Sequence, residues 1–464
     1  MEELFEAVEL EGSQHRQRLI EHMLAQLVCL GKHTVTGVLS VCGRQFDDWS
    51  AAYRMYNLNR VETDPLFHVI RSRVCAADDG PVVVALDDTG VKKTGKKVYG
   101  AKFMRDPLGP PFRVNFMWAQ RFVQLSMALK GHEGRARMIP VDWHHAPRPQ
   151  KPGKQADTET LAAYKQQCQQ TALPTVGAQR IANLRHWMDS NQARQRTLWA
   201  LVDGSFTNGT VIKQLPHNTV LVGRIRADAN LYHLPAQQPK RGRRRVYGEQ
   251  APTPEQLRQD DTHPWEAIDV FFGGKERSLR VKRLGPLRWR AAGGSCTVQL
   301  VVIAPTGYRL SPNTKRLYRK PAFLICTDPE APLQDVVQRY LWRWDIETNF
   351  RDQKTLLGVG QAQVRTPQAV QNVTATAVAA YAMLLLAADR CRENATPVDH
   401  LPAPKWQPRK PQRATTMNLI QNLRHELWAT AIHFSDFANK TTANTKSKKC
   451  IPKLHSSLFY AQRH

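Results

Sequence analysis

Residues 81–90 read PVVVALDDTG, an apolar run that ends in two aspartates and a glycine. Such a run predicts a strand that is buried on both faces, as in the centre of a sheet covered by helices. Residues 198–206, LWALVDGSF, repeat this pattern. Residues 121–130 and 136–143 predict two more strands, and the Ala-, Gln- and Leu-rich residues 158–192 predict helices. The order strand, strand, strand, helix, strand indicates an α/β core.

The rest of the chain divides around this core. The N-terminal segment has helical periodicity with arginines nearby, so a DNA-contacting unit and an ordinary helical bundle are equally good interpretations of it. Further along, short strands alternate with Pro, Gly and basic clusters, which predicts a mostly β insertion rather than a continuation of the core. We expect a helical DNA-binding domain (1–77), the first part of the core (78–209), a β-rich insertion (210–335), the second part of the core (336–394) and a basic C-terminal region (395–464).

The charge of the chain is strongly positive. Its 464 residues include 66 Lys and Arg against 40 Asp and Glu, a formal net charge of +26. An excess of this size, spread over the whole length, points first to a nucleic-acid partner, and a small acidic substrate would not require it. A basic enzyme without a polyanionic partner is the remaining alternative.

Cysteine spacing and hydropathy bear on the compartment. The eight cysteines are scattered and none forms a CxxC pair, which favours reduced thiols over a disulfide framework or a zinc ribbon. The acidic N-terminus lacks the layout of a signal peptide. The longest apolar run, residues 378–388, is shorter than the roughly 18 to 20 residues that cross a bilayer. We therefore expect an intracellular protein without a membrane partner.

Three acidic residues lie in or at the ends of predicted elements. Asp88, with Asp87 beside it, ends the first strand, Asp203 ends the fourth, and Glu347 lies in a helix predicted over residues 334–357. Strand ends are where an open α/β sheet presents its functional side chains. A single aspartate at such a place is more often a turn former or a helix cap, so each position alone is weak support for a site.

The predicted helix contains YLWRWDIETNFRDQK at residues 340–354. At about 100° per residue, Tyr340, Arg343, Glu347 and Lys354 share one face of a regular helix, about 60° wide. One carboxylate between two cations and a phenol could bind a metal while its neighbours bind phosphates. Ordinary i,i+4 ion pairing explains Arg343 and Glu347 alone, but the combination with two strand-end aspartates favours a catalytic site.

The spacing Tyr-x2-Arg-x3-Glu-x6-Lys resembles the signature of a group of bacterial insertion-sequence transposases with a DDE active site. Asp88–Thr89 after an apolar strand resembles the first aspartate motif of that family, and Val-Asp-Gly at 202–204 resembles the second. The likeness covers roughly residues 30–390 and includes the long β-rich segment. It implies an α/β fold in which an RNase H-like core is interrupted by a large, mostly β insertion, with an N-terminal helical domain and a basic C-terminal tail.

The resemblance also implies a metal site. Asp88, Asp203 and Glu347 would bind two Mg²⁺ ions, for which Mn²⁺ would substitute, and carboxylate oxygens suit such hard cations. Two ions of this kind support an in-line displacement at a phosphodiester. The match to the Asp-Thr motif is the reason to prefer Asp88 to Asp87.

By the same resemblance, four residues would contact DNA near the cleaved end: Tyr340, Arg343, Arg351 and Lys354. The implied partners are double-stranded DNA, both the terminal inverted repeats of an element and its target, and a second copy of the chain on paired ends. The implied location is the bacterial cytoplasm, at the nucleoid when bound. Relatives stack a flipped base on a tryptophan late in the insertion, but residues 320–324, KPAFL, contain none, so we assign this role to no residue.

We therefore expect a DNA transposase that hydrolyses phosphodiester bonds at the ends of its element and joins the 3′-hydroxyl ends to target DNA. Two other interpretations stay open. One is an RNase H-like nuclease that cuts without strand transfer. The other is a DNA-binding protein that descends from a transposase and does not use the catalytic residues.

Overall fold

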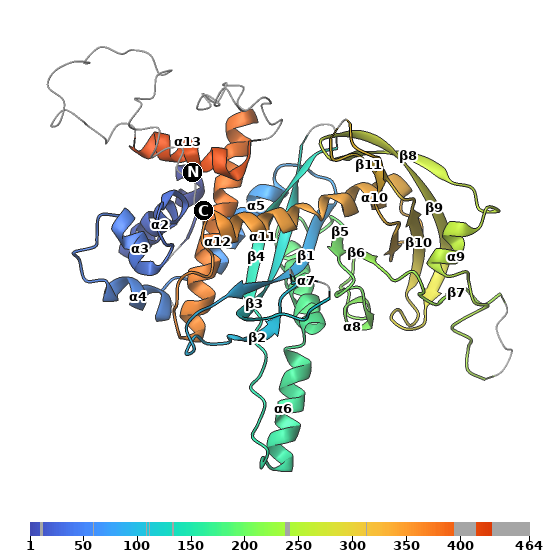
Figure 1. The fold of residues 1–464 in the computed structure, drawn as a ribbon, viewed down its shortest axis with the longest axis horizontal. Coiled ribbons are helices and arrows are strands. Elements are labelled where there is room, and N and C mark those ends of the chain that lie inside the picture. The colour runs from blue at the N-terminus through green and yellow to red at the C-terminus, as the bar shows by residue number, and fades with distance from the viewer. Residues whose placement is uncertain are drawn as a thin grey trace. The chain divides into compact units, whose positions relative to one another are not determined.

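The computed structural model describes residues 1–9, 13–58, 60–107, 109–110, 112–131, 134–236, 242–311, 313–393 and 414–428. The chain forms two compact units. Figure 1 labels their helices and strands. The first, which we call the sheet unit, comprises residues 74–90 and 121–347. The second, which we call the helical unit, comprises residues 1–73, 91–120 and 348–464.

The centre of the sheet unit consists of three parallel strands, β1 (Val82–Lys92), β5 (Leu198–Val202) and β6 (Thr219–Arg224). Residues 82–86 of β1 and the whole of β5 are buried, as expected of strands covered on both faces. β3 (Phe116–Lys130) neighbours β1, and β4 (Ala136–His145) pairs antiparallel with β3. The predicted strands of the core are thereby confirmed.

The strands of the predicted insertion continue this sheet. β6 is followed by β13 (Ala322–Cys326), β10 (Thr297–Ile303) and β9 (Lys275–Trp289), each antiparallel to its neighbour. β6 pairs with the edge that β5 would otherwise leave exposed, and β13 pairs with β6, so the strands run on from the core in one sheet. The expectation of a separate insertion stays a prediction. The shorter elements are α8 (Gly209–Ile212), β7 (Leu231–His233), α9 (Pro254–Gln259), β8 (Glu266–Phe272), β11 (Gly307–Tyr308) and β12 (Leu317–Tyr318).

The helices predicted over residues 158–192 are α6 (Thr158–Gln170) and α7 (Leu173–Asp189). The single helix predicted over 334–357 is instead two helices, α10 (Leu333–Trp342) and α11 (Asp345–Thr355). At the break, the backbone N–H of Arg343 donates to the carbonyl of Tyr340, three residues back rather than four, at 3.2 Å. The tighter turn means that residues before and after the break do not share the face of one regular helix.

The helical unit is built around α12 (Pro367–Glu393), which packs against α2 (Ser13–Val28), α4 (Ser50–Asn57) and α13 (Thr416–Trp428). Residues Pro367–Asp389 are long and apolar enough to cross a membrane, but 89% of the most apolar window is buried, so α12 is a core helix of this unit. Four further elements are α1 (Glu2–Glu6), α3 (Val35–Val41), α5 (Asp64–Cys75) and β2 (Lys102–Arg105).

The predicted division into five parts stays a prediction. Most of the basic C-terminal region, including KTTANTKSKKC at residues 440–450, lies outside the described residues.

Candidate active site

The register of β1 and β5 decides which acidic side chain of β1 lies beside Asp203, the residue that follows β5. Leu86 of β1 pairs with Val202 of β5, so the next residues in register are Asp87 and Asp203. Matched positions of adjacent strands project to the same face, and successive residues project to opposite faces. Asp87 and Asp203 therefore share a face, and Asp88 projects to the other.

Hydrogen bonds and ion pairs agree with this division. The carboxylate of Asp88 pairs with Arg121 of β3, with Oδ2 and Nε 3.3 Å apart. The carboxylate of Asp87 pairs instead with Arg343, with Oδ2 and Nη1 3.1 Å apart. The predicted first ligand, Asp88, thus lies on the face opposite the other acids, because register and alternation, which the Asp-Thr motif does not encode, orient the two side chains.

Asp203 is held by the turn that follows β5. Its Oδ1 accepts hydrogen bonds from the backbone N–H groups of Ser205 and Phe206 at 2.9 and 3.3 Å, and its Oδ2 accepts one from the Ser205 hydroxyl at 3.1 Å. Phe206 is fully buried and anchors the turn. An aspartate that caps such a turn is common in proteins, so these contacts explain the orientation of Asp203 and not, by themselves, a function.

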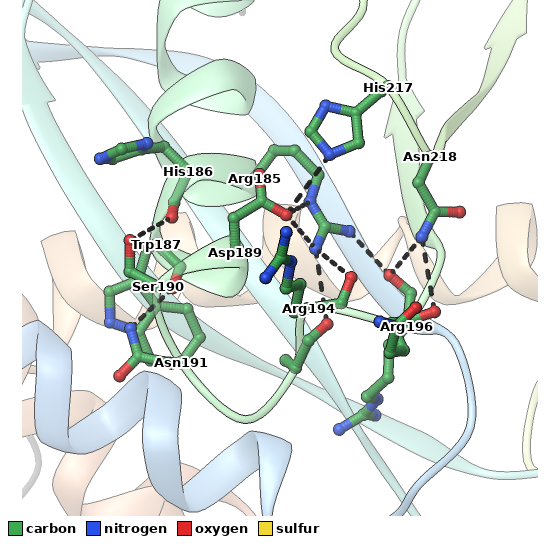
Figure 2. Close-up of polar contacts among 12 residues, drawn as sticks. Arg185, His186, Trp187, Asp189, Ser190, Asn191, Arg194, Arg196, His217 and Asn218 are labelled. Atoms are coloured by element: carbon green, nitrogen blue, oxygen red, sulfur yellow. Dashed lines mark hydrogen bonds and ion pairs between the residues drawn. The ribbon is translucent and has the colours of Figure 1, made fainter.

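The turn that leads into β5 is held by a buried arginine (Figure 2). Arg185 of α7 is 1% exposed, and its Nε donates to Asp189 at 3.1 Å. Its other nitrogens donate to three backbone carbonyls of the turn, those of Ala193, Arg194 and Arg196. Asn218, at a positive φ of 49°, donates to the Arg196 carbonyl at 3.1 Å. These contacts hold the turn from which the short strand β5 begins, and Asp203 follows the last residue of that strand, Val202.

Glu347 enters the same neighbourhood from the first turn of α11. The start of that helix is tied to the sheet, because Asp345 accepts a hydrogen bond from the backbone N–H of Met138 in β4 at 3.0 Å. Arg343 bridges the acids: besides Asp87, its guanidinium contacts Glu347, with Nη2 and Oε1 3.6 Å apart. The same guanidinium lies 5.5 Å from the centre of the Tyr340 ring.

The ionisation of the acids shows that they are electrostatically coupled. Burial raises the pKa of Asp87 to about 7; the charge of Arg343 opposes this, and the charges of Asp203 and Asp88 add to it. Burial also raises the pKa of Glu347, again opposed by Arg343 and reinforced by Asp203. For Arg343, burial lowers the pKa, but Tyr340 and the surrounding acids outweigh it and raise the pKa.

The donor set suits a divalent cation in kind, since three carboxylates that repel one another are stabilised by added positive charge. Within the part of the chain that the structure describes, no three acidic, histidine or cysteine side chains are arranged to hold one ion together. Instead the Arg343 guanidinium, 8% exposed, supplies the positive charge to Asp87 and Glu347.

Of the predicted DNA-contacting residues, Tyr340 and Arg343 lie beside the acids. Lys354 and Arg351 belong to the part of α11 that lies in the helical unit. Arg351 is paired with Asp352, with Nη2 and Oδ1 3.0 Å apart, and Lys354 Nζ lies 5.9 Å from the centre of the Phe350 ring.

Three residues that contact the predicted acids or lie beside them were not among the predicted site residues: Arg121, Asp345 and Asp87. Arg121 had no signal, because a single arginine in a strand is unremarkable until its partner is known. Asp345 could have been found as an acidic residue in the first turn of a helix, had the break before it been predicted. Asp87 was visible beside Asp88, but the strand register that matches Asp87 with Asp203 has no local signal in the sequence.

The comparison with known families is compatible with this architecture, a large mixed sheet with helices. The DDE superfamily endonuclease family matches residues 8–293, more than half of the chain. The chain belongs to the DDE superfamily endonuclease family. The match includes both aspartate motifs and ends before Glu347. No curated protein matches the sequence.

Membership in this family supports an enzyme of the nuclease or transposase type that acts on DNA. Endonucleases of this superfamily typically use divalent metal ions.

Proposed function

We propose that the protein is the transposase of a bacterial insertion sequence. It binds the terminal inverted repeats of its element, hydrolyses phosphodiester bonds at the ends and joins the 3′-hydroxyl ends to target DNA. The observation that carries the proposal is the convergence of Asp87, Asp203 and Glu347, from β1, β5 and α11, on one electrostatically coupled neighbourhood around Arg343.

We assign the first carboxylate to Asp87 and not to Asp88. Asp87 has its charge coupled to Asp203 and its side chain paired with the arginine that also contacts Glu347. Asp88 pairs with Arg121 and would position β1 against β3. In this assignment Asp87, Asp203 and Glu347 would hold two Mg²⁺ ions, with Mn²⁺ as a substitute, and such ions activate the attacking oxygen and stabilise the leaving one.

The surrounding residues then have defined roles. Arg343 neutralises Asp87 and Glu347 in the free protein and moves to a DNA phosphate when the acids take up cations, because a guanidinium can exchange one oxyanion for another. Tyr340 holds the guanidinium against its ring. Arg351, whose side chain is 67% exposed, and Lys354 contact the DNA backbone further along α11. The protein acts as a homodimer on paired ends in the bacterial cytoplasm, at the nucleoid.

The test is Mg²⁺-dependent cleavage and joining of a DNA that carries the ends of the element, with the wild type beside Glu347→Gln. We expect the variant to lose both activities and to retain DNA binding. Equal cutting by both proteins would remove Glu347 from the chemistry. A wild type that cuts but never joins would be the nuclease without strand transfer, and a wild type that binds without cutting would be the catalytically unused DNA-binding protein.

A further inference from the structure

An exposed aromatic face lies on the hairpin of β2 and β3, in the helical unit. Phe103 pairs with Trp118, and Arg105 pairs with Phe116, so these four side chains project from the same side of the hairpin. Phe103 is 71% exposed and Phe116 is 66% exposed. The hairpin therefore presents apolar rings to solvent on the side where a soluble sheet normally carries polar residues.

The exposure is confined to one side of the hairpin. The alternate residues Met117 and Ala119 are 9% and 2% exposed, so the hairpin buries one face and leaves the aromatic face uncovered. The Phe103 and Trp118 rings meet edge to face, with centroids 5.1 Å apart, which holds the Phe103 ring upright on the hairpin. A contiguous exposed apolar patch on a folded protein marks an interaction site more often than an isolated ring does.

The same segment is strongly basic. Residues 92–119 contain seven Lys and Arg against a single acid, Asp106. Asp106 is already paired with Lys92, with Oδ2 and Nζ 3.2 Å apart. The exposed Arg105 thus projects from the aromatic face, next to Phe103 on its own strand and opposite Phe116 on the paired strand. The net charge of residues 92–119 is positive.

The neighbouring basic loop is held against the hairpin. Trp118 Nε1 donates to the carbonyl of Gly95 at 3.1 Å, and the Gly95 N–H donates to Gln363 at 3.1 Å. Lys96 and Lys97 follow immediately in the chain. Lys93, in contrast, is buried and donates from Nζ to the carbonyls of Gly360 and Ala362, so it fastens the loop and is not exposed to a ligand.

We propose that this aromatic face, Phe103, Phe116 and Trp118 with Arg105, binds unpaired nucleobases of single-stranded DNA by stacking, while Lys96 and Lys97 contact its phosphates. Ring faces and fixed cations are the combination that binds single strands without sequence preference, because every base has a flat apolar surface and every nucleotide a charge. A second copy of the chain is a poor occupant, since a two-fold contact would set one basic hairpin against another. The inference rests on the proposed function in one respect: the cutting and joining of DNA ends would produce the unpaired bases that this face binds.

The test measures binding of the full-length protein to a fluorescein-labelled single-stranded oligonucleotide and to the duplex of the same sequence, in EDTA. We expect Phe103→Ala and Phe116→Ala each to weaken single-strand binding by about fivefold to a hundredfold, the range for one stacked base, with a smaller effect on the duplex. Phe103→Trp should keep the wild-type affinity. Phe46→Ala is the matched control, because Phe46 is 92% exposed in the same unit and lies outside the hairpin.

Several results would overturn the inference. Unchanged single-strand affinity in both alanine variants would do so, as would an equal loss for single strand and duplex, since stacking needs unpaired bases. A shift of the variants from dimer to monomer in sedimentation, with unchanged DNA binding, would assign the face to a second copy. Loss of binding to anionic lipid vesicles with unchanged DNA binding would assign it to a membrane surface.

The single-strand binding test can fail or succeed independently of the cleavage and joining test of the proposed function. Glu347→Gln should bind the single strand as the wild type does, because the aromatic face contains none of the acids. If the wild type neither cuts nor joins DNA while the phenylalanine variants lose single-strand binding, the transposase proposal fails and the stacking surface stands.

Discussion

Two of the buried cations of the sheet unit, Arg343 at 8% and Lys282 at 1% exposure, have surroundings that differ in kind. Lys282 Nζ donates to the carbonyls of Leu257, Arg258 and Asp260 at 3.1, 3.3 and 2.6 Å, at the end of α9, where helix carbonyls lack partners. Arg343 faces the carboxylates of Asp87 and Glu347.

The carbonyls around Lys282 are neutral, whereas the carboxylates of Asp87 and Glu347 around Arg343 are both repelled by Asp203, so a cation that replaces the guanidinium is stabilised there. Burial of a cation therefore does not identify a functional site. Acidic partners that repel one another point to a functional site, because their repulsion gives the site an affinity for added positive charge. A purely structural site lacks this affinity.

The largest effect is expected from separate substitution of the two adjacent aspartates within β1, Asp87 and Asp88. Asp87→Asn should lower Mg²⁺-dependent DNA cleavage by at least about a hundredfold, equivalent to about 3 kcal/mol of transition-state stabilisation. Asp88→Asn should lower it by less than about tenfold, because Asp88 pairs with Arg121 on the opposite face. Single-turnover cleavage rates of the two variants provide the measurement, and the reverse order would restore Asp88 as the first ligand.

Lys282 tests the structural side of the comparison. Lys282→Met keeps the aliphatic stem but leaves the carbonyls of Leu257, Arg258 and Asp260 without their shared donor, which should lower the free energy of unfolding by about 2–3 kcal/mol. Urea denaturation measures this loss. Arg280→Met is the control. Both cations lie over the Trp265 ring, Lys282 Nζ at 4.6 Å and the Arg280 guanidinium at 5.6 Å from its centre, but Arg280 is exposed, so its loss should change stability by less than about 0.5 kcal/mol. Similar losses of unfolding free energy in the two variants would show that the hydrogen bonds of Lys282 to the end of α9 do not stabilise the protein.

Arg343 tests the functional side. Without this cation, Asp87 and Glu347 lose an internal competitor for metal ions, so Arg343→Gln should bind Mn²⁺ about tenfold more tightly in the absence of DNA. Electron paramagnetic resonance of free Mn²⁺ measures the affinity without catalysis. Arg351→Gln is the matched control, because Arg351 pairs with Asp352 and should leave Mn²⁺ binding unchanged. Weaker Mn²⁺ binding by Arg343→Gln would mean that the guanidinium organises the acids and does not compete for them.

The sequence was sufficient for features that depend on local pattern. The buried strands at 82–86 and 198–202 could be predicted because a strand covered on both faces has an apolar run that no exposed element carries. The acids that follow these strands could be named for the same reason, since each ends such a run.

The remaining features depend on contacts between distant residues. The proposed assignment of Asp87 depends on the pairing of Leu86 with Val202, across more than a hundred residues of chain. The break between α10 and α11 is accompanied by two long-range hydrogen bonds, from Trp342 Nε1 to the Gly134 carbonyl at 2.9 Å and from the Met138 N–H to Asp345 at 3.0 Å. Neither bond has a signature in helical periodicity, so a single helix was the natural prediction.

The smallest effect concerns a carbonyl-held cation of the helical unit. Lys93 donates to the Gly360 and Ala362 carbonyls at 2.7 and 2.9 Å, and burial lowers its pKa to about 8. The folded protein therefore releases this proton at a lower pH than the unfolded chain, whose lysines titrate near 10.4. Between these values the unfolded state binds more protons, so the contribution of Lys93 to stability must rise with pH from about 8 upward.

Urea denaturation of the wild type and Lys93→Met at pH 7 and pH 9.5 isolates this contribution, because all other titrating groups cancel in the difference. The stability difference in favour of the wild type should be larger at pH 9.5 by roughly 1–2 kcal/mol. A difference that stays constant would mean that the two carbonyls stabilise the charged ammonium fully. Carbonyl partners would then be as effective as carboxylates in keeping a buried cation charged, and the contrast with Arg343 would rest only on the repulsion among its acids.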